Sequence, residues 1–366
     1  MPNTRSSNHY IVISNGLSEE ETDTSELEDD IGAVQHILHD KLTINEDNSS
    51  SEGSDVEEME SITLMTNQSN LYSTQMNPNK PLCVSENEMN RFIGILLMTG
   101  VYSFPQQRYF WMNTTRVESI TSAMSRDRFL QIKRNIHVFD NTNQLDSNDP
   151  NFDRAYKVLP LLNIVKENSR KIPKEEKLSA DEQIILFKGR SIMKQHMPKK
   201  PLRWGYKMFI LAGNGSGLCY DFIFYTGKEG KSVHGLCTQI VLDLCETVPR
   251  SINHKLFCDN FYTTIRLQVE LHKLDIYAVG TVRPNRLPGL IMKNEKDLSR
   301  EGRGAMDHRV AEVDGVQICA VKLYDNNIVN CLSTLHACHP VDFVQRWSNK
   351  EKKTYISKKT KYYKSL

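Results

Sequence analysis

Five short apolar runs between residues 184 and 282 limit the folds open to this chain more than any other feature. Each run is rich in β-branched and aromatic residues and is bounded by Gly, Asn, Pro or Asp, which is typical of buried β-strands. The runs are IILF (184–187), KMFILA (207–212), LCYDFIFYT (218–226), KLFC (255–258) and IYAVGTV (276–282). GNGSG (213–217) joins the second run to the third and predicts a hairpin between them.

Two segments with helical periodicity separate the later runs. HGLCTQIVLDLCETV (234–248) precedes the fourth run and TTIRLQVELHKL (263–274) follows it, and both place apolar residues three or four positions apart. The predicted order is strand, strand, strand, helix, strand, helix, strand. A three-strand meander followed by helical crossovers predicts a mixed α/β sheet. This is the order of ribonuclease H-like folds, so we expect such a core over residues 176–282.

The region before the sheet, residues 85–175, is predicted to be helical. Apolar residues recur at helical spacing in NEMNRFIGILLMTG (87–100), SRDRFLQIKRNIHV (125–138) and KVLPLLNIVKENSRK (157–171). Ser125 is a candidate N-cap for the second of these helices. The other face of that helix is basic and suits either solvent or phosphate contact; it carries Arg126, Arg128, Lys133 and Arg134.

Charge is distributed very unevenly along the chain. Residues 1–70 hold sixteen acidic and two basic residues, a net charge of −14, whereas the whole chain has +1, so the remainder carries about +15. An acidic tail on a basic body favours a polyanionic partner, although a solvated surface with an unrelated acidic tail explains the same numbers. Residues 1–84 are also poor in aromatics and rich in Ser, Thr and Asn, and we expect them to be disordered.

Cysteine usage and hydropathy favour an intracellular protein outside the membrane. The eight cysteines include no CxxC pair, and most lie inside apolar runs, which is typical of reduced core thiols. The longest apolar stretch, FIGILLMTGVY (92–102), is too short to cross a bilayer.

Two aspartates stand next to predicted strands. Asp181 precedes the first strand, and Asp259 directly follows the fourth. The first and fourth strands of a ribonuclease H-like sheet are neighbours, so the two carboxylates are expected to meet at one sheet edge. Like charges this close repel unless a cation lies between them, and Mg²⁺ is a hard cation that takes a few carboxylate oxygens. The alternative is structural: Asp181 caps a turn and Asp259 is a strand-end turn residue.

Several stretches, in order, resemble the piggyBac-type transposase family. They are LSADEQIILFKGR (178–190), MPKKPLRWG (197–205), NHKLFCDNFYTT (253–264), IYAVGTVRPNR (276–286) and GRGAMDHRV (302–310), and the resemblance covers about residues 85–350. It implies a cut-and-paste DNA transposase that acts at TTAA targets with a Mg²⁺-bound triad of catalytic Asp residues. Asp181 and Asp259 match the first and second of that triad.

The same resemblance implies the surrounding organisation. The helical region 85–175 matches the dimerisation and DNA-binding region, which implies DNA and a second copy of the chain as partners. A β-rich insertion is expected over residues 283–340, where GVQICAVKLYDNNIVNCLST (315–334) alternates and contains the turn DNN.

The third aspartate of the family pattern has no counterpart here. In the family it lies in a Gly-Gly-Val-Asp segment, whereas the last glycine of this chain is Gly315 and residues 341–366 form a divergent basic tail. Asp342 is the nearest candidate substitute in sequence. We therefore expect a transposase-derived DNA-binding protein with an ancestral, incomplete metal site; an active transposase, or a fragment of one, is the alternative.

Basic residues near both aspartates are the expected DNA contacts, because phosphate binding relies on Lys and Arg. They are Lys188, Arg190, Lys199, Lys200 and Arg203 after the first Asp, and Arg283 and Arg286 after the fifth strand. Trp204 and Tyr206 suit base stacking, or else Trp204 anchors the core or a hairpin. The Lys-rich tail suits a nuclear localisation signal or a solvated terminus, so a nuclear protein is expected, with the cytoplasm as the alternative.

Overall fold

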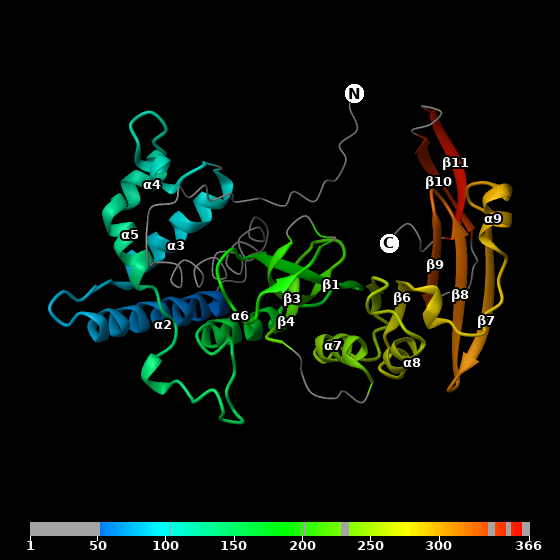
Figure 1. Ribbon diagram of the computed structural model, residues 1–366, viewed down its shortest axis with the longest axis horizontal. Helices are drawn as coiled ribbons and strands as arrows, with labels where there is room; N and C mark the ends of the chain where they lie inside the picture. Colours follow the sequence, from blue (N-terminus) through cyan, green and yellow to red (C-terminus); the bar gives the residue numbers. More distant parts are fainter. Residues whose placement is uncertain are drawn as a thin grey trace. The chain divides into compact units, whose positions relative to one another are not determined.

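The computed structural model describes most of the chain from residue 52 onward (Figure 1). The described residues are 52–102, 104–198, 200, 203–227, 234–335, 341–348 and 353–360. They divide into two compact units. The first extends to Asn168 and includes Ile184–Tyr206; the second comprises Ser169–Gln183 and the residues from Lys207 onward.

The first unit is largely helical. Its helices are α2 (Glu52–Met76), α3 (Glu86–Val101), α4 (Glu118–Ala123), α5 (Arg126–Asn135) and α6 (Leu159–Lys171), with the 3-10 turns η1 (Gln107–Trp111) and η2 (Asn141–Asn143). The three helices predicted from apolar spacing are present as α3, α5 and α6. Ser125 caps α5 as expected, because its hydroxyl accepts a hydrogen bond from the Arg128 amide at 3.3 Å.

Helix α2 corrects the expectation that residues 1–84 are disordered. Residues 52–76 are helical, and α2 packs against α3 and α5. Its buried positions include Ile62, Met65, Ser69 and Ser73, which recur every three or four residues. Small hydroxyl side chains bury well against neighbouring helices but give no hydropathy signal, so the average composition hid this helix. Residues 1–51 lie outside the described part of the chain.

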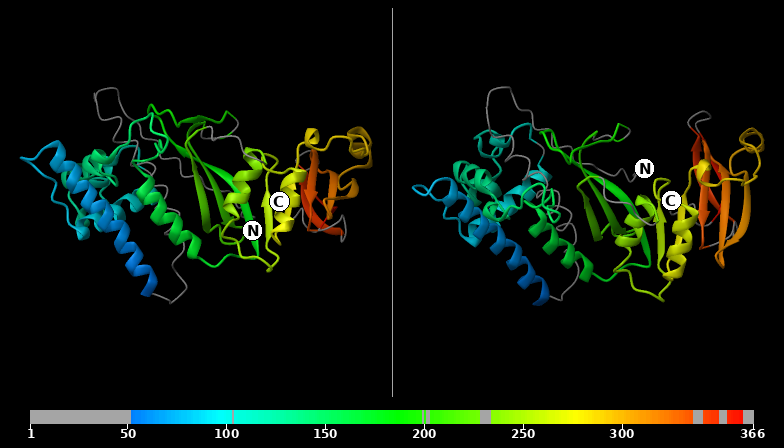
Figure 2. Two further views of the ribbon diagram at one scale, coloured as in Figure 1. Left: turned by 90° about the horizontal axis from the view of Figure 1, so that it is seen from below. Right: turned by 60° about the horizontal axis from the view of Figure 1, so that its bottom comes forward.

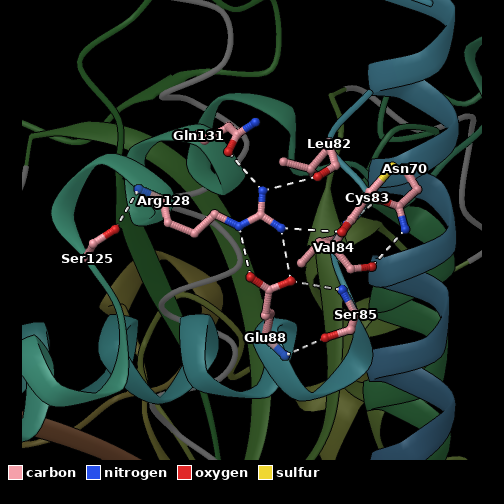
Figure 3. A network of polar contacts seen from close by, with 9 residues as sticks. All are labelled: Asn70, Leu82, Cys83, Val84, Ser85, Glu88, Ser125, Arg128 and Gln131. Carbon is pink, nitrogen blue, oxygen red and sulfur yellow. Dashed lines mark hydrogen bonds and ion pairs between the residues drawn. The ribbon is translucent and has the colours of Figure 1, made fainter. Parts of the chain in front are cut away.

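Arg128 links α5 to α3 and to the loop that precedes α3 (Figure 3). Its guanidinium donates two hydrogen bonds to the Glu88 carboxylate, both at 2.9 Å, and others to the carbonyls of Leu82 and Cys83 at 3.1 and 3.3 Å. Glu88 also accepts from the Ser85 amide and completes the capping box of α3. Arg128 is therefore a structural residue of the loop before α3 rather than part of a solvated basic face.

A mixed sheet organises the second unit. Its strands include β1 (Lys177–Leu186), β3 (Trp204–Gly213), β4 (Cys219–Tyr225), β5 (Lys255–Cys258) and β6 (Tyr277–Thr281), with α7 (Leu236–Leu244) and α8 (Ile265–Lys273) as crossovers. Further strands are β2 (Gln195–His196), β7 (Met306–Val313), β8 (Val316–Tyr324) and β9 (Ile328–Ser333); the strand order is β2-β3-β1-β5-β6-β9-β8-β7, and β4 pairs with β3. β1, β5 and β6 are parallel to one another, whereas β3 and β4 form the antiparallel hairpin predicted from GNGSG. The predicted mixed α/β sheet of ribonuclease H-like order is confirmed.

The core beside this sheet is apolar and almost completely buried. Leu178, Leu256 and Ala278 of the three parallel strands are almost completely buried, together with residues of α7 and α8. α7 packs against β4, and α8 packs against β6 (Figure 2). The seven cysteines within the described residues are free thiols, and three of them, Cys245, Cys258 and Cys319, are buried.

The β-rich insertion predicted over residues 283–340 extends the same sheet. It contains β7 (Met306–Val313), β8 (Val316–Tyr324) and β9 (Ile328–Ser333), which form an antiparallel meander after η3 (Pro284–Arg286) and α9 (Glu295–Glu301). β9 pairs with β6, with Val279 opposite Ser333. The segment is therefore continuous with the central strands, and α8 packs against both β8 and β9.

Part of the basic tail forms a second, small sheet. β10 (Val341–Ser348) and β11 (Lys353–Thr360) pair antiparallel, and Asp342, the candidate substitute ligand, stands opposite Lys359 in this register. Across the ranges that the structure describes, no helix combines the length and apolar character needed to span a membrane.

Candidate active site

Asp181 and Asp259 occupy matching positions at the end of one parallel ladder. β1 and β5 pair from Lys177 opposite Lys255 to Ala180 opposite Cys258; Asp181 is the next residue of β1, and Asp259 directly follows the end of β5. Matched residues of a parallel pair point to the same face of the sheet. The structure therefore places Asp181 and Asp259 side by side, and both residues are exposed.

The expected start of the first strand was wrong. IILF predicted a strand from residue 184, whereas β1 begins at Lys177, so Asp181 lies within the strand rather than before it. KLSA (177–180) contains no β-branched residue and gives little strand signal, but its pairing with β5 extends the strand.

Thr281 occupies the equivalent position on the next strand of the sheet, β6. β6 pairs with β5 so that Gly280 stands opposite Cys258. The residues that come next, Thr281 after Gly280 and Asp259 after Cys258, are therefore neighbours. The Thr281 hydroxyl donates to Asp259 Oδ1 at 2.9 Å. This hydrogen bond orients the Asp259 carboxylate, and sequence reasoning missed it because a single Thr after an apolar run carries no signal of its own.

The turn after Asp259 depends on a close backbone approach. The Asp259 carbonyl accepts from the amides of Tyr262 and Thr263 and from the Thr263 hydroxyl, at 3.0 to 3.2 Å. A Cβ at position 280 would lie 2.1 Å from Thr263 Oγ1 and 2.8 Å from the Cys258 carbonyl oxygen. Only glycine fits at this position, and a Gly inside a strand pattern such as YAVGT was the available sequence signal for it.

A buried layer lies beneath the two carboxylates. Burial raises the pKa of the Cys258 thiol well above its usual value, with smaller contributions from Cys245 and from the negative charges of Asp181 and Asp259. Burial also raises the pKa of Tyr262, and its hydroxyl donates to Glu182 Oε2 at 3.2 Å. Both groups are therefore neutral near pH 7, and the negative charge of the site lies on the carboxylates.

The donor set fits a hard divalent cation. Mg²⁺ is usually held by one or two carboxylates and takes water or phosphate oxygens as its other ligands. Asp181 and Asp259 offer such a pair on an exposed sheet edge. Among the residues that the structure describes, no group of three or more His, Cys, Asp or Glu side chains is placed to hold a metal ion.

A hollow of about 1040 Å³ opens beside Asp259. Its lining includes three cationic side chains, Arg283, Lys296 and Arg300, and the asparagines of the β8–β9 turn. Glu295 also lines the hollow, so Asp259 faces a space bordered by three cationic side chains and one other carboxylate, and this excess of positive charge suits a phosphate-bearing ligand.

The two arginines after β6 have different surroundings. Arg283 is exposed, lines the hollow and donates to Asn260 Oδ1 at 3.1 Å. Arg286 donates to the carbonyls of Asn260 and Thr263, both at 2.9 Å. Arg286 therefore braces the turn that carries Asp259, and Arg283 is the better placed of the two for an external phosphate.

The other predicted DNA contacts lie in the first unit, on the segment 184–206. Lys188, Arg190 and Arg203 are exposed, Lys200 is partly exposed, and Lys199 lies outside the described residues. The two aromatic residues of this segment behave differently. Tyr206 is buried with its ring centroid 4.6 Å from that of Phe187, whereas Trp204 remains 47% exposed.

Comparisons with known proteins identify the family. A family model described as Transposase IS4 matches residues 57–365. Human PiggyBac transposable element-derived protein 3 is 32% identical over 302 residues, which cover 80% of this chain and 49% of that protein. The chain belongs to the piggyBac-type transposase family. Human PiggyBac transposable element-derived protein 2 is 30% identical over 300 residues, again covering 80% of this chain and 49% of that protein.

A solved piggyBac transposase shares the fold. The cryo-EM structure of a piggyBac transposase synaptic complex with hairpin DNA superposes with a TM-score of 0.63 at 22% identity, covering 81% of this chain and 61% of that one. The chain spans about half the length of the curated piggyBac-derived relatives described above. The family match also extends into the tail that was expected to diverge from the family pattern.

Proposed function

We propose that this chain is a piggyBac transposase-derived DNA-binding protein that keeps two carboxylates of a Mg²⁺ site and does not by itself cleave DNA. The observation that carries the proposal is the matched position of Asp181 and Asp259, together with the hollow beside Asp259 that Arg283, Lys296 and Arg300 line. Family membership adds support, because a related transposase has been solved as a synaptic complex with hairpin DNA.

The residues of the site have distinct proposed roles. Asp181 and Asp259 would hold Mg²⁺, which supplies Lewis-acid activation for phosphoryl transfer when it is bound. Thr281 orients Asp259, and Arg286 braces the turn that follows it. Arg283 contacts a DNA phosphate at the mouth of the hollow. The cations of the segment 184–206, namely Lys188, Arg190, Lys199, Lys200 and Arg203, supply further phosphate contacts in the first unit.

Absence of cleavage follows from the ligand count. The described residues contribute two carboxylates to this site, whereas the family pattern has three, and a two-metal phosphoryl-transfer site needs ligands for both ions. The test is a Mg²⁺-dependent cleavage assay on TTAA-flanked transposon ends. We expect no product. Product that disappears in Asp181→Ala or Asp259→Ala would overturn this part of the proposal.

The second candidate function is an active cut-and-paste transposase of which this chain is a part. The observation that favours it is that the chain spans about half the length of its curated relatives. The genomic reading frame after Tyr355 separates the two candidates. A continuation that encodes a Gly-Gly-Val-Asp segment, and that restores cleavage when joined to this chain, would favour the active enzyme.

We propose the nucleus as the site of action, because DNA is the proposed partner and residues 350–364 contain seven lysines. A fluorescent fusion of the whole chain should concentrate in nuclei, and deleting residues 350–364 should release it to the cytoplasm. A whole-chain fusion confined to the cytoplasm would contradict the proposal. We also propose a homodimer by analogy with the family, which sedimentation of the purified chain would test.

A further inference from the structure

The segment 184–206 is an exclusively cationic element. Between Gln183 and Tyr220 the sequence contains no Asp or Glu. Within 184–206 six basic residues occur, namely Lys188, Arg190, Lys194, Lys199, Lys200 and Arg203. A solvated surface normally mixes both signs of charge, so a run of one sign favours a polyanionic ligand.

Trp204 projects from this cationic element on a fixed backbone. β2 (Gln195–His196) pairs with β3 so that His196 stands opposite Trp204. The Trp204 carbonyl accepts from the Phe187 amide, and the neighbouring residue Tyr206 is buried against Phe187. A Cβ at Gly205 would lie 2.0 Å from the Ile185 carbonyl oxygen, so the strand approaches its neighbour closely at this point. The backbone of Trp204 is therefore held in place while its indole remains 47% exposed.

The indole forms one half of an aromatic pair. The rings of His196 and Trp204 are stacked with centroids 4.2 Å apart and planes 24° apart, and His196 is exposed as well. Lys194 Nζ lies 5.3 Å from the Trp204 ring centroid and donates to the Gly189 carbonyl. The pair thus presents flat aromatic surface, already stacked and flanked by a cation, to the outside of the first unit.

An exposed aromatic pair within a cationic field matches one class of ligand best. Nucleic acid offers both negative charge and flat faces, but a duplex hides its base faces inside the stack. Unpaired nucleotides expose these faces, and stacking on aromatic side chains is the usual way in which proteins bind them. Acidic peptides would use the cations and leave the paired rings without a role.

We propose that the His196–Trp204 pair is a stacking platform for an unpaired nucleotide of a DNA strand, with Lys194 and other cations of the segment 184–206 on its phosphates. The inference deepens the proposed DNA-binding function and rests on it. It adds a distinction between paired and unpaired DNA that phosphate contacts alone do not make, because those contacts are independent of base pairing.

The experiment measures binding of the whole chain to a single-stranded oligo(dT) of about 16 nucleotides, and to a duplex of the same length, by fluorescence anisotropy. Trp204→Leu should weaken oligo(dT) binding by roughly 5- to 100-fold, the loss of one stacked base, and should leave duplex binding unchanged. Trp204→Phe should retain most of the oligo(dT) affinity because it keeps an aromatic face. Trp347→Phe is the matched control, since Trp347 is also exposed, at 53%, and should change neither affinity.

Each other outcome has a defined meaning. Unchanged oligo(dT) binding in Trp204→Leu, or an equal loss for oligo(dT) and duplex, would overturn the stacking platform while leaving DNA binding intact. A chain that binds neither oligonucleotide would refute the proposed function itself. If Trp204→Leu does not fold, quenching of the intrinsic tryptophan fluorescence decides: oligo(dT) should quench the wild-type chain and Trp347→Phe, and should quench Trp204→Phe much less. Equal quenching in all three would overturn the inference.

Discussion

Thr281 donates a hydrogen bond of 2.9 Å to Asp259, and each of the two residues comes directly after the last matched pair of the parallel strands β5 and β6. Asp181 occupies the equivalent position on β1, directly after the matched pair Ala180 and Cys258. Three strands of different sequence position therefore deliver two carboxylates and an orienting hydroxyl to one edge of the sheet. The chemistry available at this edge follows from strand register, because a slip by one residue would turn these side chains to the opposite face.

Replacing Gly280 by alanine should displace the turn that carries Asp259 and destabilise the chain. The new methyl group would meet Thr263 Oγ1 and the Cys258 carbonyl, so the turn that carries Asp259 must shift. We expect a loss of roughly 1–3 kcal/mol in the free energy of unfolding, measured by urea denaturation. Gly94→Ala is the matched control: nothing lies within 4 Å of its Cβ position in α3, and the change should stabilise the chain by about 0.5–1 kcal/mol. Equal effects of the two substitutions would contradict the packing argument.

Arg128→Met should destabilise the helical unit. The substitution removes the guanidinium from Glu88 and from two loop carbonyls, and we expect a loss of roughly 1–3 kcal/mol in unfolding free energy. Arg126→Met is the comparison, because Arg126 and its partner Asp127 have side chains that are 54% and 83% exposed. That exposed pair should contribute less than about 0.5 kcal/mol. If both variants unfold at the same urea concentration, the network around Arg128 is not the structural link described above.

Acid should weaken the packing of α2 through His137. This side chain is buried, its ring stacks on Tyr72 with centroids 3.6 Å apart, and its Nε2 lies 3.5 Å from Asn141 Nδ2. Burial lowers its pKa in the folded chain, and the nearby positive charge of Lys157 acts in the same direction. The neutral ring thus contributes stability that is present above the unfolded-state pKa and is lost as pH falls toward the lower folded pKa.

The measurement is the urea midpoint of the helical unit between about pH 7.5 and pH 5.5, on either side of the usual histidine pKa. Wild type should lose stability as pH falls, and His137→Phe should flatten the profile because it keeps the stacking partner of Tyr72 without a titrating group. His308→Phe, at an exposed position of β7, should leave the profile as in wild type. A profile that is insensitive to His137→Phe would exclude this residue as the cause.

Arg283→Gln should weaken duplex binding and reduce its dependence on salt. Loss of one phosphate contact lowers the slope of log K against log salt concentration by about one. Anisotropy titrations over a range of NaCl concentrations give that slope directly. Arg116→Gln, at an exposed arginine paired with Glu118, should leave the slope unchanged. A slope that is unaffected by Arg283→Gln would remove this residue from the proposed DNA contacts.

The sequence was sufficient to predict the order of strands and helices in the central sheet, because β-branched runs and helical spacing are strong local signals. It also predicted that Asp181 and Asp259 lie close together, because it placed the first and fourth strands side by side; β1 and β5 are neighbours, although Asp181 lies within β1 and not before it. The predicted 315–334 strands are present as β8 and β9. Their pairing with β6 depends on contacts distant in sequence, which local patterns do not contain.

The features that the sequence did not reveal depend on small residues, or on residues with low propensity for the structure that they adopt. Helix α2 buries serines and a threonine, β1 begins with four residues of low β-propensity, and Gly280 matters only because Thr263 approaches it. Charge patterns were ambiguous for a similar reason. Arg128 and Arg286 looked like candidate phosphate contacts, but tertiary structure uses both to hold backbone carbonyls.

The most direct test of the central claim is the binding of Mn²⁺, a stand-in for Mg²⁺ that also prefers oxygen ligands, measured by electron paramagnetic resonance on the whole chain. We expect a saturable site whose affinity falls at least about tenfold in Asp181→Asn and in Asp259→Asn, and by a smaller factor in Thr281→Val. The double Asp variant should bind Mn²⁺ more weakly than either single variant, because both carboxylates serve one site. Mn²⁺ affinity that is unchanged in either single Asp variant would contradict the account.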